Sequence, residues 1–291
     1  MRPRRFLPTT RRLLVAAVLV GAVLVAYSAL RETRRLELRA YDVRVPGLPK
    51  ELDGFRIAQL SDLHRSLIVP DSLIRRAVDL ANISRADVAV LTGDFVSRNA
   101  DNAEPCARML SRLRTRGGSF AILGNHDHWT DARTVAAALR RHGITVLDNK
   151  SVEVVPGLYL VGIDDQWAGR PDVPAAFAGV GSNACYVMLS HTPLAVDLFT
   201  GKRGLLITGH THGGQVQIPL VNRKRLPGLR GWRYIQGWYR EGDILMYVNR
   251  GIGTVNPAVR FRCRPEVTGY VLHRGDSDAR PRRGSNHGNT E

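Results

Sequence analysis

The chain has 291 residues, of which 42 are Lys or Arg and 26 are Asp or Glu, so its formal net charge is +16. A hydrophobic fraction of 44% and a charged fraction of 23% are ordinary for a globular protein, and they exclude a disordered chain, a collagen and a polytopic membrane protein. Three cysteines without a CxxC pair argue against a disulfide scaffold and a thiolate zinc site.

The amino-terminal flank, residues 1–39, predicts a basic membrane anchor. Its segment 13–30 carries no charge, and a helix of that length would be about 27 Å long, enough to cross a hydrocarbon core. Arginines stand on both sides of the segment. A cleaved signal peptide is the alternative, but it has a shorter apolar region and small residues before the cut. We expect a single-pass anchor in the inner (cytoplasmic) membrane, and the balanced flanking charges leave the side of the catalytic domain open.

The remainder reads as one layered α/β domain over residues 55–273, because short apolar runs alternate with amphipathic stretches. Pro and Gly punctuate residues 40–54, which predict a linker and an edge strand. The strand-like runs are 55–61, 87–93, 119–124, 158–163, 184–190, 204–209, 244–249 and 267–272. Helical spacing of apolar residues predicts helices over 70–84, 101–116 and 130–141. The polar segment 274–291 predicts a disordered tail.

Polar residues that bind metals or move protons follow five of these runs. They are Asp62 and His64; Asp94; Asn125, His126 and Asp127; His191; and His210 and His212. The crevice beyond the carboxyl ends of the strands is the usual binding site of an open α/β sheet. A single loop Asp is usually a turn former, but five such positions in register are hard to explain as solvated loops. The pattern therefore predicts one site assembled from five strand ends.

The donor chemistry favours a pair of divalent ions. Carboxylate, amide and imidazole donors without a thiolate suit Mn, Fe or Zn. Their number exceeds what one tetrahedral ion needs, whereas two ions that share a bridging carboxylate would use them economically. We expect two divalent ions, with Mn preferred and Fe, Zn or a mixed pair as alternatives. A hydroxide held between the ions would be a nucleophile near neutral pH.

In order and spacing, the motifs resemble the five signature blocks of the calcineurin-like metallophosphoesterases. The blocks are Asp62-Leu63-His64, Gly93-Asp94, Gly124-Asn125-His126-Asp127, Ser190-His191 and Gly209-His210-Thr211-His212. Segments 209–219, 247–253 and 261–266 resemble a narrower bacterial branch of membrane-associated phosphoesterases, some of which are linked to hydrolysis of UDP-2,3-diacylglucosamine in lipid A synthesis. The resemblance implies a four-layer α/β/β/α sandwich behind an N-terminal transmembrane helix.

The resemblance also implies a role for each matched residue. Asp62, His64 and His212 would hold the first ion, and Asn125, His191 and His210 would hold the second. Asp94 would bridge both. His126 would lie near the leaving oxygen as general acid or transition-state stabiliser, with Asp127 orienting its imidazole. A structural hydrogen bond is the alternative role for His126.

Two positions depart from the family pattern. Many relatives have GDxxDR in the second block, whereas this chain has Ser97 in place of the second acid, so a hydrogen-bond partner of the site is weakened or supplied elsewhere. Arg98 keeps its place and is a candidate phosphate contact. Arg65 stands where relatives often have Gly, and it would either grip a substrate phosphate or point to solvent.

Residues 222–240 combine basic and aromatic residues and are rich in Gly, which predicts a long loop beside the site. Arg and Trp together suit a membrane interface with acidic headgroups, and on this interpretation Arg225, Arg230 and Trp232 are candidate substrate contacts. The same residues suit single-stranded nucleic acid. The third interpretation is a structured loop whose aromatic side chains pack on the domain.

Together these features predict a membrane-anchored, dinuclear metal-dependent phosphohydrolase. Its expected partners are membrane lipid and a phosphate-bearing, lipid-linked substrate such as UDP-2,3-diacylglucosamine. One alternative is an envelope phosphodiesterase or phosphatase on a non-lipid substrate, and another is a non-catalytic metal- and membrane-binding protein, although none of the seven ligands is missing. Neither nucleic acid nor an obligate protein partner is expected.

Overall fold

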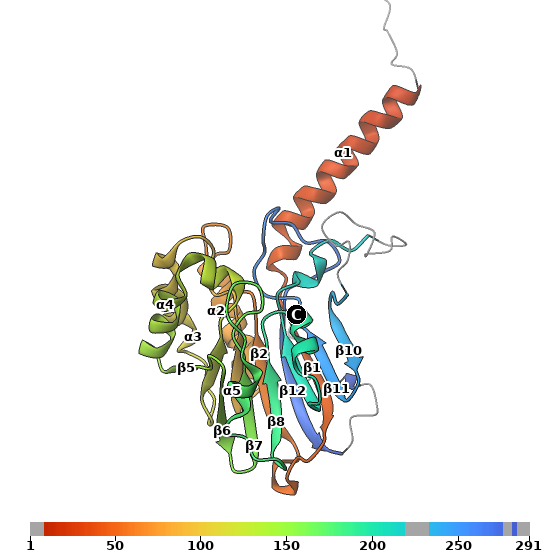
Figure 1. The fold of residues 1–291 in the computed structure, drawn as a ribbon. Helices are drawn as coiled ribbons and strands as arrows, with labels where there is room; N and C mark the ends of the chain where they lie inside the picture. Colours follow the sequence, from red (N-terminus) through yellow and green to blue (C-terminus); the bar gives the residue numbers. More distant parts are fainter. Residues whose placement is uncertain (1–8, 219–232, 276–280, 284–291) are drawn as a thin grey trace, which may run out of the picture.

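Two β-sheets lie face to face, and helices cover their outer surfaces (Figure 1). The computed structural model describes residues 9–218, 233–275 and 281–283. The first sheet has the strand order β13-β1-β12-β2-β3-β4-β5, and the second has the order β10-β11-β9-β8-β7-β6. Strands of the first sheet are β1 (Glu37–Val45), β2 (Phe55–Leu60), β3 (Val88–Thr92), β4 (Ser119–Ile122), β5 (Ile144–Val146), β12 (Glu266–Arg274) and β13 (Arg282–Arg283). Strands of the second sheet are β6 (Lys150–Val155), β7 (Leu158–Gly162), β8 (Cys185–Leu189), β9 (Gly204–Thr208), β10 (Gly237–Glu241) and β11 (Ile244–Val248).

The helices connect the strands and shield the apolar faces of the sheets. The α-helices are α1 (Thr9–Leu30), α2 (Asp71–Ile83), α3 (Ala103–Leu110), α4 (Asn125–Arg141) and α5 (Val173–Phe177). Short 3-10 turns are η1 (Glu32–Arg34), η2 (Lys50–Leu52), η3 (Ala100–Asn102), η4 (Pro193–Leu198) and η5 (His212–Gly214).

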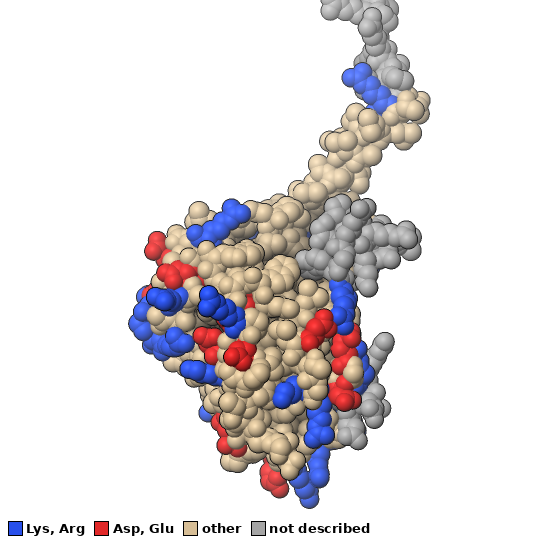
Figure 2. Space-filling model, in the orientation of Figure 1, with Lys and Arg blue, Asp and Glu red and all other residues tan. Residues whose placement is uncertain are grey.

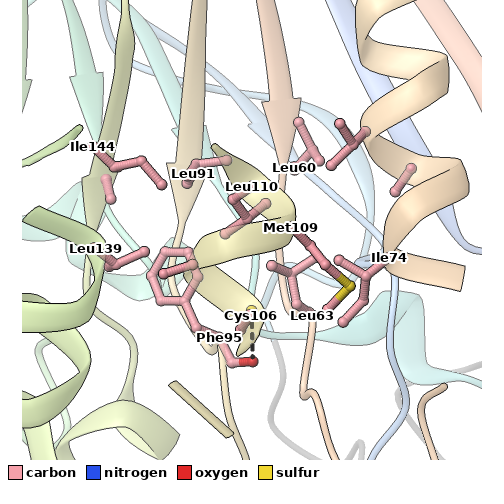
Figure 3. Packing of buried hydrophobic residues seen from close by; sticks show 14 of the residues in the cluster. Leu60, Leu63, Ile74, Leu91, Phe95, Cys106, Met109, Leu110, Leu139 and Ile144 are labelled. Carbon is pink, nitrogen blue, oxygen red and sulfur yellow. Dashed lines mark hydrogen bonds between the residues drawn. The ribbon is translucent and has the colours of Figure 1, made fainter. Parts of the chain in front are cut away.

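Three layers of buried apolar side chains hold these elements together. The inner layer joins the facing surfaces of the two sheets, for example Ile57 against the strands that carry Leu189 and Ile207. An outer layer packs α2, α3 and α4 on the first sheet, around Phe95 and Leu110 (Figure 3). A smaller layer packs α5 and η4 on the second sheet. The predicted four-layer α/β/β/α sandwich is therefore confirmed.

A buried polar connection joins the two sheets beneath the ends of their strands. The side-chain amide of Gln59 on β2 donates to Thr92 Oγ1 at 2.8 Å and to the backbone carbonyl of Thr208 on β9 at 3.0 Å. Its carbonyl oxygen accepts the Tyr270 hydroxyl at 2.6 Å. A buried amide with satisfied partners costs little, whereas a partly satisfied one is expensive. Gln59 therefore fixes how the sheets sit relative to each other.

The apolar helix α1 projects from one end of the sandwich, and its surface is uncharged along most of its length (Figures 1 and 2). Together with the following turn, it is the one helix among the described residues that is long and apolar enough to cross a membrane, judged by length and composition. Its carboxyl end is attached to the domain, because Glu32 Oε1 accepts the Cys263 amide at 2.9 Å and Leu36 enters the outer core.

Strand directions place α1 and the predicted site at the same end of the sandwich. β1 begins just after α1 and runs parallel to β12, and β12 is antiparallel to β2. β2, β3 and β4 run parallel to one another. The end at which β1 begins is therefore the end at which β2, β3 and β4 finish.

Several boundaries differ from the sequence-based expectation. The stretch 40–54 lies partly in β1, a nine-residue strand that pairs with β12 along its whole length and with the short β13 on its other side. The helix expected over 101–116 ends at Leu110 as α3. α4 begins at Asn125 and contains a non-helical residue, Asp131, close to the expected start at 130. Most of the predicted tail lies outside the described residues.

Replacing Gln59 by Leu should destabilise the fold. The change leaves the Thr208 carbonyl and the Tyr270 hydroxyl without the amide that they contact, so we expect the free energy of unfolding to fall by roughly 2–4 kcal/mol. Thr145→Leu on the exposed face of β5 is the control and should change it by less than about 0.5 kcal/mol. Urea denaturation followed by circular dichroism measures both. Equal stabilities of the two variants would contradict the connecting role of Gln59.

Candidate metal centre

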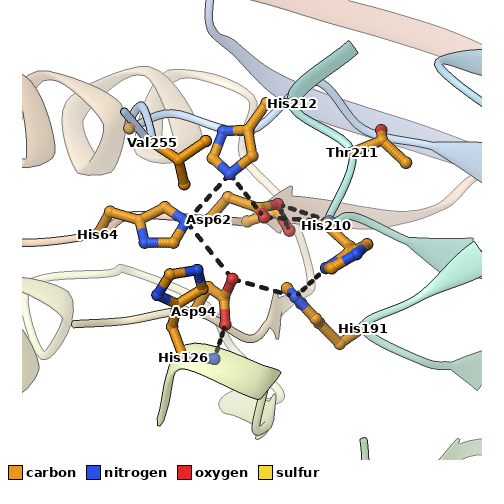
Figure 4. Close-up of polar contacts among 12 residues, drawn as sticks. Asp62, His64, Asp94, His126, His191, His210, Thr211, His212 and Val255 are labelled. Carbon is orange, nitrogen blue, oxygen red and sulfur yellow. Dashed lines mark hydrogen bonds and ion pairs between the residues drawn. The ribbon is translucent and has the colours of Figure 1, made fainter. Parts of the chain in front are cut away.

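The candidate ligands stand where five strands end, and the backbone there turns sharply. Asp62, His64, Asp94, His210 and His212 all have a positive φ, between 47° and 70°. Left-handed backbone is uncommon in residues other than Gly and costs about 1–3 kcal/mol at such positions, so surrounding contacts must hold it. The turns direct the side chains of both sheets into a common space (Figure 4).

Three donors from the two sheets form a first group. The donor atoms of Asp62, His64 and His212 lie within 4.8 Å of one another. His64 Nε2 is 3.0 Å from His212 Nε2, and His212 Nε2 is 3.4 Å from Asp62 Oδ1. Neighbouring donors in an octahedral site with bonds of about 2.1 Å lie roughly 3 Å apart, so this spacing fits a divalent ion.

Asp94 lies between this group and a second one. Its Oδ2 is 3.4 Å from His64 Nε2 and 3.2 Å from His191 Nε2. The donors of Asp94, His191 and His210 again lie within 4.8 Å of one another, and Asn125 Oδ1 is 3.1 Å from His191 Nε2. One carboxylate oxygen therefore faces imidazoles of both groups, which is the arrangement that a bridging ligand requires.

Close packing around Asp94 depends on glycine. A Cβ on Gly124 would collide with Asp94 Oδ1 and lie 2.8 Å from the His191 ring. A Cβ on Gly93 would lie 2.6 Å from the Gly124 amide nitrogen, and the φ of Gly93 is +86°. The glycines that precede Asp94 and Asn125 in the motifs are thus required by the approach of these two loops.

In His64 and His191, the ring nitrogen Nδ1 forms a hydrogen bond with a neighbouring residue. His64 Nδ1 is 2.7 Å from Ser97 Oγ, and His191 Nδ1 is 2.7 Å from the Thr92 carbonyl. With Nδ1 protonated, the neutral His64 ring keeps its Nε2 lone pair for the site, and the His191 ring gains one when it loses its second proton. Ser97 therefore occupies the place of the family's second acid and supplies a neutral partner instead of a charged one.

Burial and mutual charge set the protonation of the group. Burial lowers the pKa of His64 to about 4 and that of His210 to about 3, so both rings are neutral near pH 7. Burial would raise the pKa of Asp94, but His191 and His64 hold it well below its usual range. Burial would lower the pKa of His191, but Asp94 and Asp62 raise it to about 10. Burial raises the pKa of Asp62 to about 6.

Asp127 was predicted to orient the His126 imidazole, but it contacts backbone amides instead. Its carboxylate accepts the backbone amides of Asp94, Phe95 and Gly124 at 2.8–3.0 Å, and that of Val96 at 3.3 Å. With four amides on its two oxygens, it shapes the loop of Asp94 and does not orient the His126 imidazole. The His126 ring packs against the rings of His64 and Trp129, with centroids 4.7 and 5.0 Å apart.

The predicted substrate contacts separate into three cases. Arg65 is turned away from the donors, because its guanidinium binds Asp71 at 3.0 Å and also Asn102. Arg98 is exposed, and its positive charge contributes to lowering the pKa of His126 after burial. Arg225, Arg230 and Trp232 lie outside the described residues.

The described part of the basic and aromatic segment packs on the domain. Arg233 pairs with Asp197 and Glu241 at 2.9 and 3.0 Å. Tyr234 is buried, and the Trp238 ring packs on Tyr41 and Tyr247. For residues 233–240 this favours the packing interpretation over contact with lipid or nucleic acid.

Sequence reasoning missed two residues beside the donors. Arg260 is fully buried, donates to the carbonyls of Arg250 and Gly253 at 2.8 and 2.6 Å, and lies 3.5 Å from His212 Nδ1. Trp167 packs edge-on against His210 at a centroid distance of 4.3 Å. Neither stands in one of the five motifs, and Trp167, although it follows the run 158–163, is not a residue type that binds metals, so the pattern did not mark them.

Residues 55–214 match the family model for calcineurin-like phosphoesterase. The chain is 34% identical to the phosphodiesterase YaeI of Escherichia coli over 222 residues, which cover 74% of this chain and 80% of that protein. It is 26% identical to the UDP-2,3-diacylglucosamine pyrophosphatase LpxG of Chlamydia muridarum, with 81% of this chain and 89% of that protein covered.

One vertebrate relative is named as a transmembrane protein. The chain is 29% identical to the transmembrane protein with metallophosphoesterase domain of Danio rerio over 276 residues, covering 89% of this chain and 62% of that protein. This chain therefore spans less than two thirds of that relative.

Metal binding should weaken as the pH falls. A proton on His191, whose pKa is raised, must leave before its nitrogen can bind an ion, and Asp62 adds a second proton below about pH 6. Because raised pKa values mean bound protons below them, affinity should drop about tenfold per pH unit between pH 8 and 6, with about one proton released. Calorimetric titration with Mn²⁺ in buffers of different ionisation enthalpy measures this. Binding without proton release would contradict it.

Proposed function

The chain belongs to the calcineurin-like phosphoesterases, and on that premise we propose that it is a dinuclear metallophosphodiesterase of the inner membrane that acts on a lipid-linked phosphate. As a member of this family it is a phosphoester hydrolase, and the family uses divalent metals. One observation supports the dinuclear site most: a single oxygen of Asp94 lies within 3.4 Å of imidazoles from two separate donor groups.

We assign the donors by the groups in which they lie. Asp62, His64 and His212 would hold one ion, and Asn125, His191 and His210 the other, with Asp94 shared. The set of two carboxylates, one amide and four imidazoles suits Mn²⁺, which we propose as the metal. The chemistry that such a pair supplies when bound is charge stabilisation on the phosphoryl oxygens and a lower pKa for the attacking water.

His126 lies beside the candidate ligands, and a nitrogen of its ring lies within 4.8 Å of donor atoms of His64 and Asp94. Its ring is half-buried beside His64, and burial lowers its pKa, so it is a neutral imidazole at pH 7. A neutral ring can donate an N–H to a phosphoryl or leaving-group oxygen without repelling the donors. Asp127 acts through the Asp94 loop and is a positioning residue.

Exposed apolar residues at the ends of the strands support a lipid-linked substrate. The loop after β2 presents Ile68 with 55% of its surface exposed, and Leu67 is fully exposed. Trp129 and Trp167, which pack on His126 and His210, are 62% and 50% exposed. These residues surround the strand ends at the end of the sandwich that carries α1, where a bilayer would lie.

The relative named as a UDP-2,3-diacylglucosamine pyrophosphatase makes that nucleotide-linked lipid our first candidate substrate. It requires the catalytic domain in the cytoplasm, so a reporter fused after residue 291 discriminates. A domain on the opposite side of the membrane would favour the alternative, an envelope phosphodiester. The span of α1 and the transmembrane relative together suggest a single-pass membrane protein.

Two substitutions separate metal binding from proton donation. Asp94→Asn removes the shared charge and should abolish hydrolysis of bis(p-nitrophenyl) phosphate together with most bound metal, by loss of the bridging ligand. His126→Gln should retain both metals while kcat falls by about 10²–10⁴-fold. Metal analysis by mass spectrometry and rates with and without chelator measure these effects.

The control for that pair is Asp79→Asn on the exposed face of α2, which should leave metal content and rate unchanged. Asp94→Asn with normal metal content and rate would remove the dinuclear assignment.

The substrate proposal is tested by a matched pair of isoleucines. Ile68→Ser should lower kcat/KM on the lipid substrate in vesicles several-fold, because the side chain no longer enters the apolar interface, and should leave hydrolysis of the soluble diester unchanged. Ile83 is equally exposed, at 56%, but lies at the end of α2 away from the site, so Ile83→Ser should affect neither rate. Equal effects of the two variants would argue for a water-soluble substrate.

A further inference from the structure

A basic cavity lies where α1 joins the domain, separate from the candidate metal centre. It has a volume of about 880 Å³. None of the candidate metal ligands lines it. Its walls come from α1 and the segment that follows it, from α2, and from the stretch before β12. They contain eight arginines, two glutamates and three apolar or aromatic residues: Arg31, Arg34, Arg35, Arg39, Arg76, Arg250, Arg262, Arg264, Glu32, Glu37, Tyr27, Leu30 and Phe261.

Within the part of the chain that the structure describes, ion pairs reach only the inner arginines of the cavity. Arg250 and Arg39 pair with Glu37 and with the buried Glu266. Across residues 9–218, 233–275 and 281–283, the structure records no ion pair for the other six: Arg31, Arg34, Arg35, Arg76, Arg262 and Arg264. Glu32 uses one oxygen to accept the Cys263 amide. The cavity therefore gathers guanidinium groups beyond what its own acids compensate, and such groups bind phosphate oxygens in pairs.

The position of the cavity favours a membrane lipid as the source of an anionic ligand. Tyr27 and Leu30 belong to the last turns of the apolar helix, so one wall of the cavity is the carboxyl end of the predicted span. Lipid headgroups lie at this level of a transmembrane helix, and Tyr is typical of it. A phosphodiester in the cavity could keep its acyl chains along α1, which is exposed over most of its length and buried at Ser28.

The segment that joins α1 to β1 is held against the domain by specific contacts. The turn η1 follows α1 directly, Arg76 on α2 donates to the Arg34 carbonyl at 3.3 Å, and Leu36 is buried in the outer core. The walls of the cavity are thus attached to the domain.

We propose that this cavity binds the headgroup of an acidic phospholipid of the surrounding bilayer. Clusters of Arg next to a membrane helix attract anionic lipids, and a pocket adds specificity for one phosphate. Because the cavity and the strand ends share one end of the sandwich, a bound lipid holds the domain with its catalytic end toward the membrane.

Arg262→Gln combined with Arg264→Gln tests the site in full-length, metal-loaded protein in detergent. These two arginines are chosen because changes at Arg31, Arg34 or Arg35 could alter membrane topology. The probes are dihexanoyl phosphatidylglycerol, dihexanoyl phosphatidylcholine and inorganic phosphate, and binding is measured by native mass spectrometry and calorimetry. The control, Arg112→Gln with Arg114→Gln, removes the same charge from exposed residues between α3 and β4.

We expect the wild type and the control to bind phosphatidylglycerol at least tenfold more tightly than phosphatidylcholine, and the cavity variant to lose that preference. Hydrolysis of bis(p-nitrophenyl) phosphate by the cavity variant should stay within twofold, which separates this site from the metal centre. Equal binding of the two lipids, an unchanged cavity variant, or inorganic phosphate binding as tightly as phosphatidylglycerol would each overturn the proposal.

Discussion

The carboxylate of Asp94 is the contact on which the rest of the site depends. Asp94 follows β3 of the first sheet, yet one of its oxygens faces His191, which follows β8 of the second. The other oxygen accepts the His126 amide at 2.8 Å and so holds the start of α4. A negative charge in this buried position is tolerable only among groups that stabilise it, and His191, His64 and the amides around them do so. The two sheets can supply one site only if they are held in this register, which is the task of the inner core and of Gln59 beneath it.

Contacts around the site stabilise its left-handed backbone and set the charges of its side chains. Five candidate ligands hold left-handed backbone, and the amides of the loop after β3 are directed onto Asp127. Buried Arg260 adds a fixed positive charge behind His212, and after burial it contributes to keeping the pKa values of His64 and His212 low. Neutral imidazoles beside an ionised carboxylate are ready to bind a cation. The replacement of an acid by Ser97 fits this scheme, because a neutral partner holds the His64 ring without adding a second charge.

Local sequence pattern predicted the buried strands and the candidate donors. It did not predict the half-exposed strands or the side-chain contacts that depend on tertiary packing. Runs such as Val88–Thr92 are buried at every position, and their apolar composition marked them as strands. β6 and β10 are half-exposed and carry mixed polar residues, so periodicity did not separate them from loops. The candidate metal donors were predicted because each follows a strongly apolar run. Arg65 binds Asn102, and Asp127 binds the amides of the loop after β3; these partners lie 37 and 31–33 residues away, and no spacing rule reaches them.

The shared end of anchor and site follows from chain direction. A strand parallel to β12 and entered directly from α1 must begin at the end where the antiparallel neighbour β2 finishes. The six residues between α1 and β1 are partly coiled in η1 and bound to α2, so they cannot carry the domain around to present another face. A bilayer crossed by α1 therefore lies toward the strand ends that carry the donors. An enzyme built this way meets substrates held at the membrane surface first, and the arginines beside the anchor meet the headgroups of the same surface.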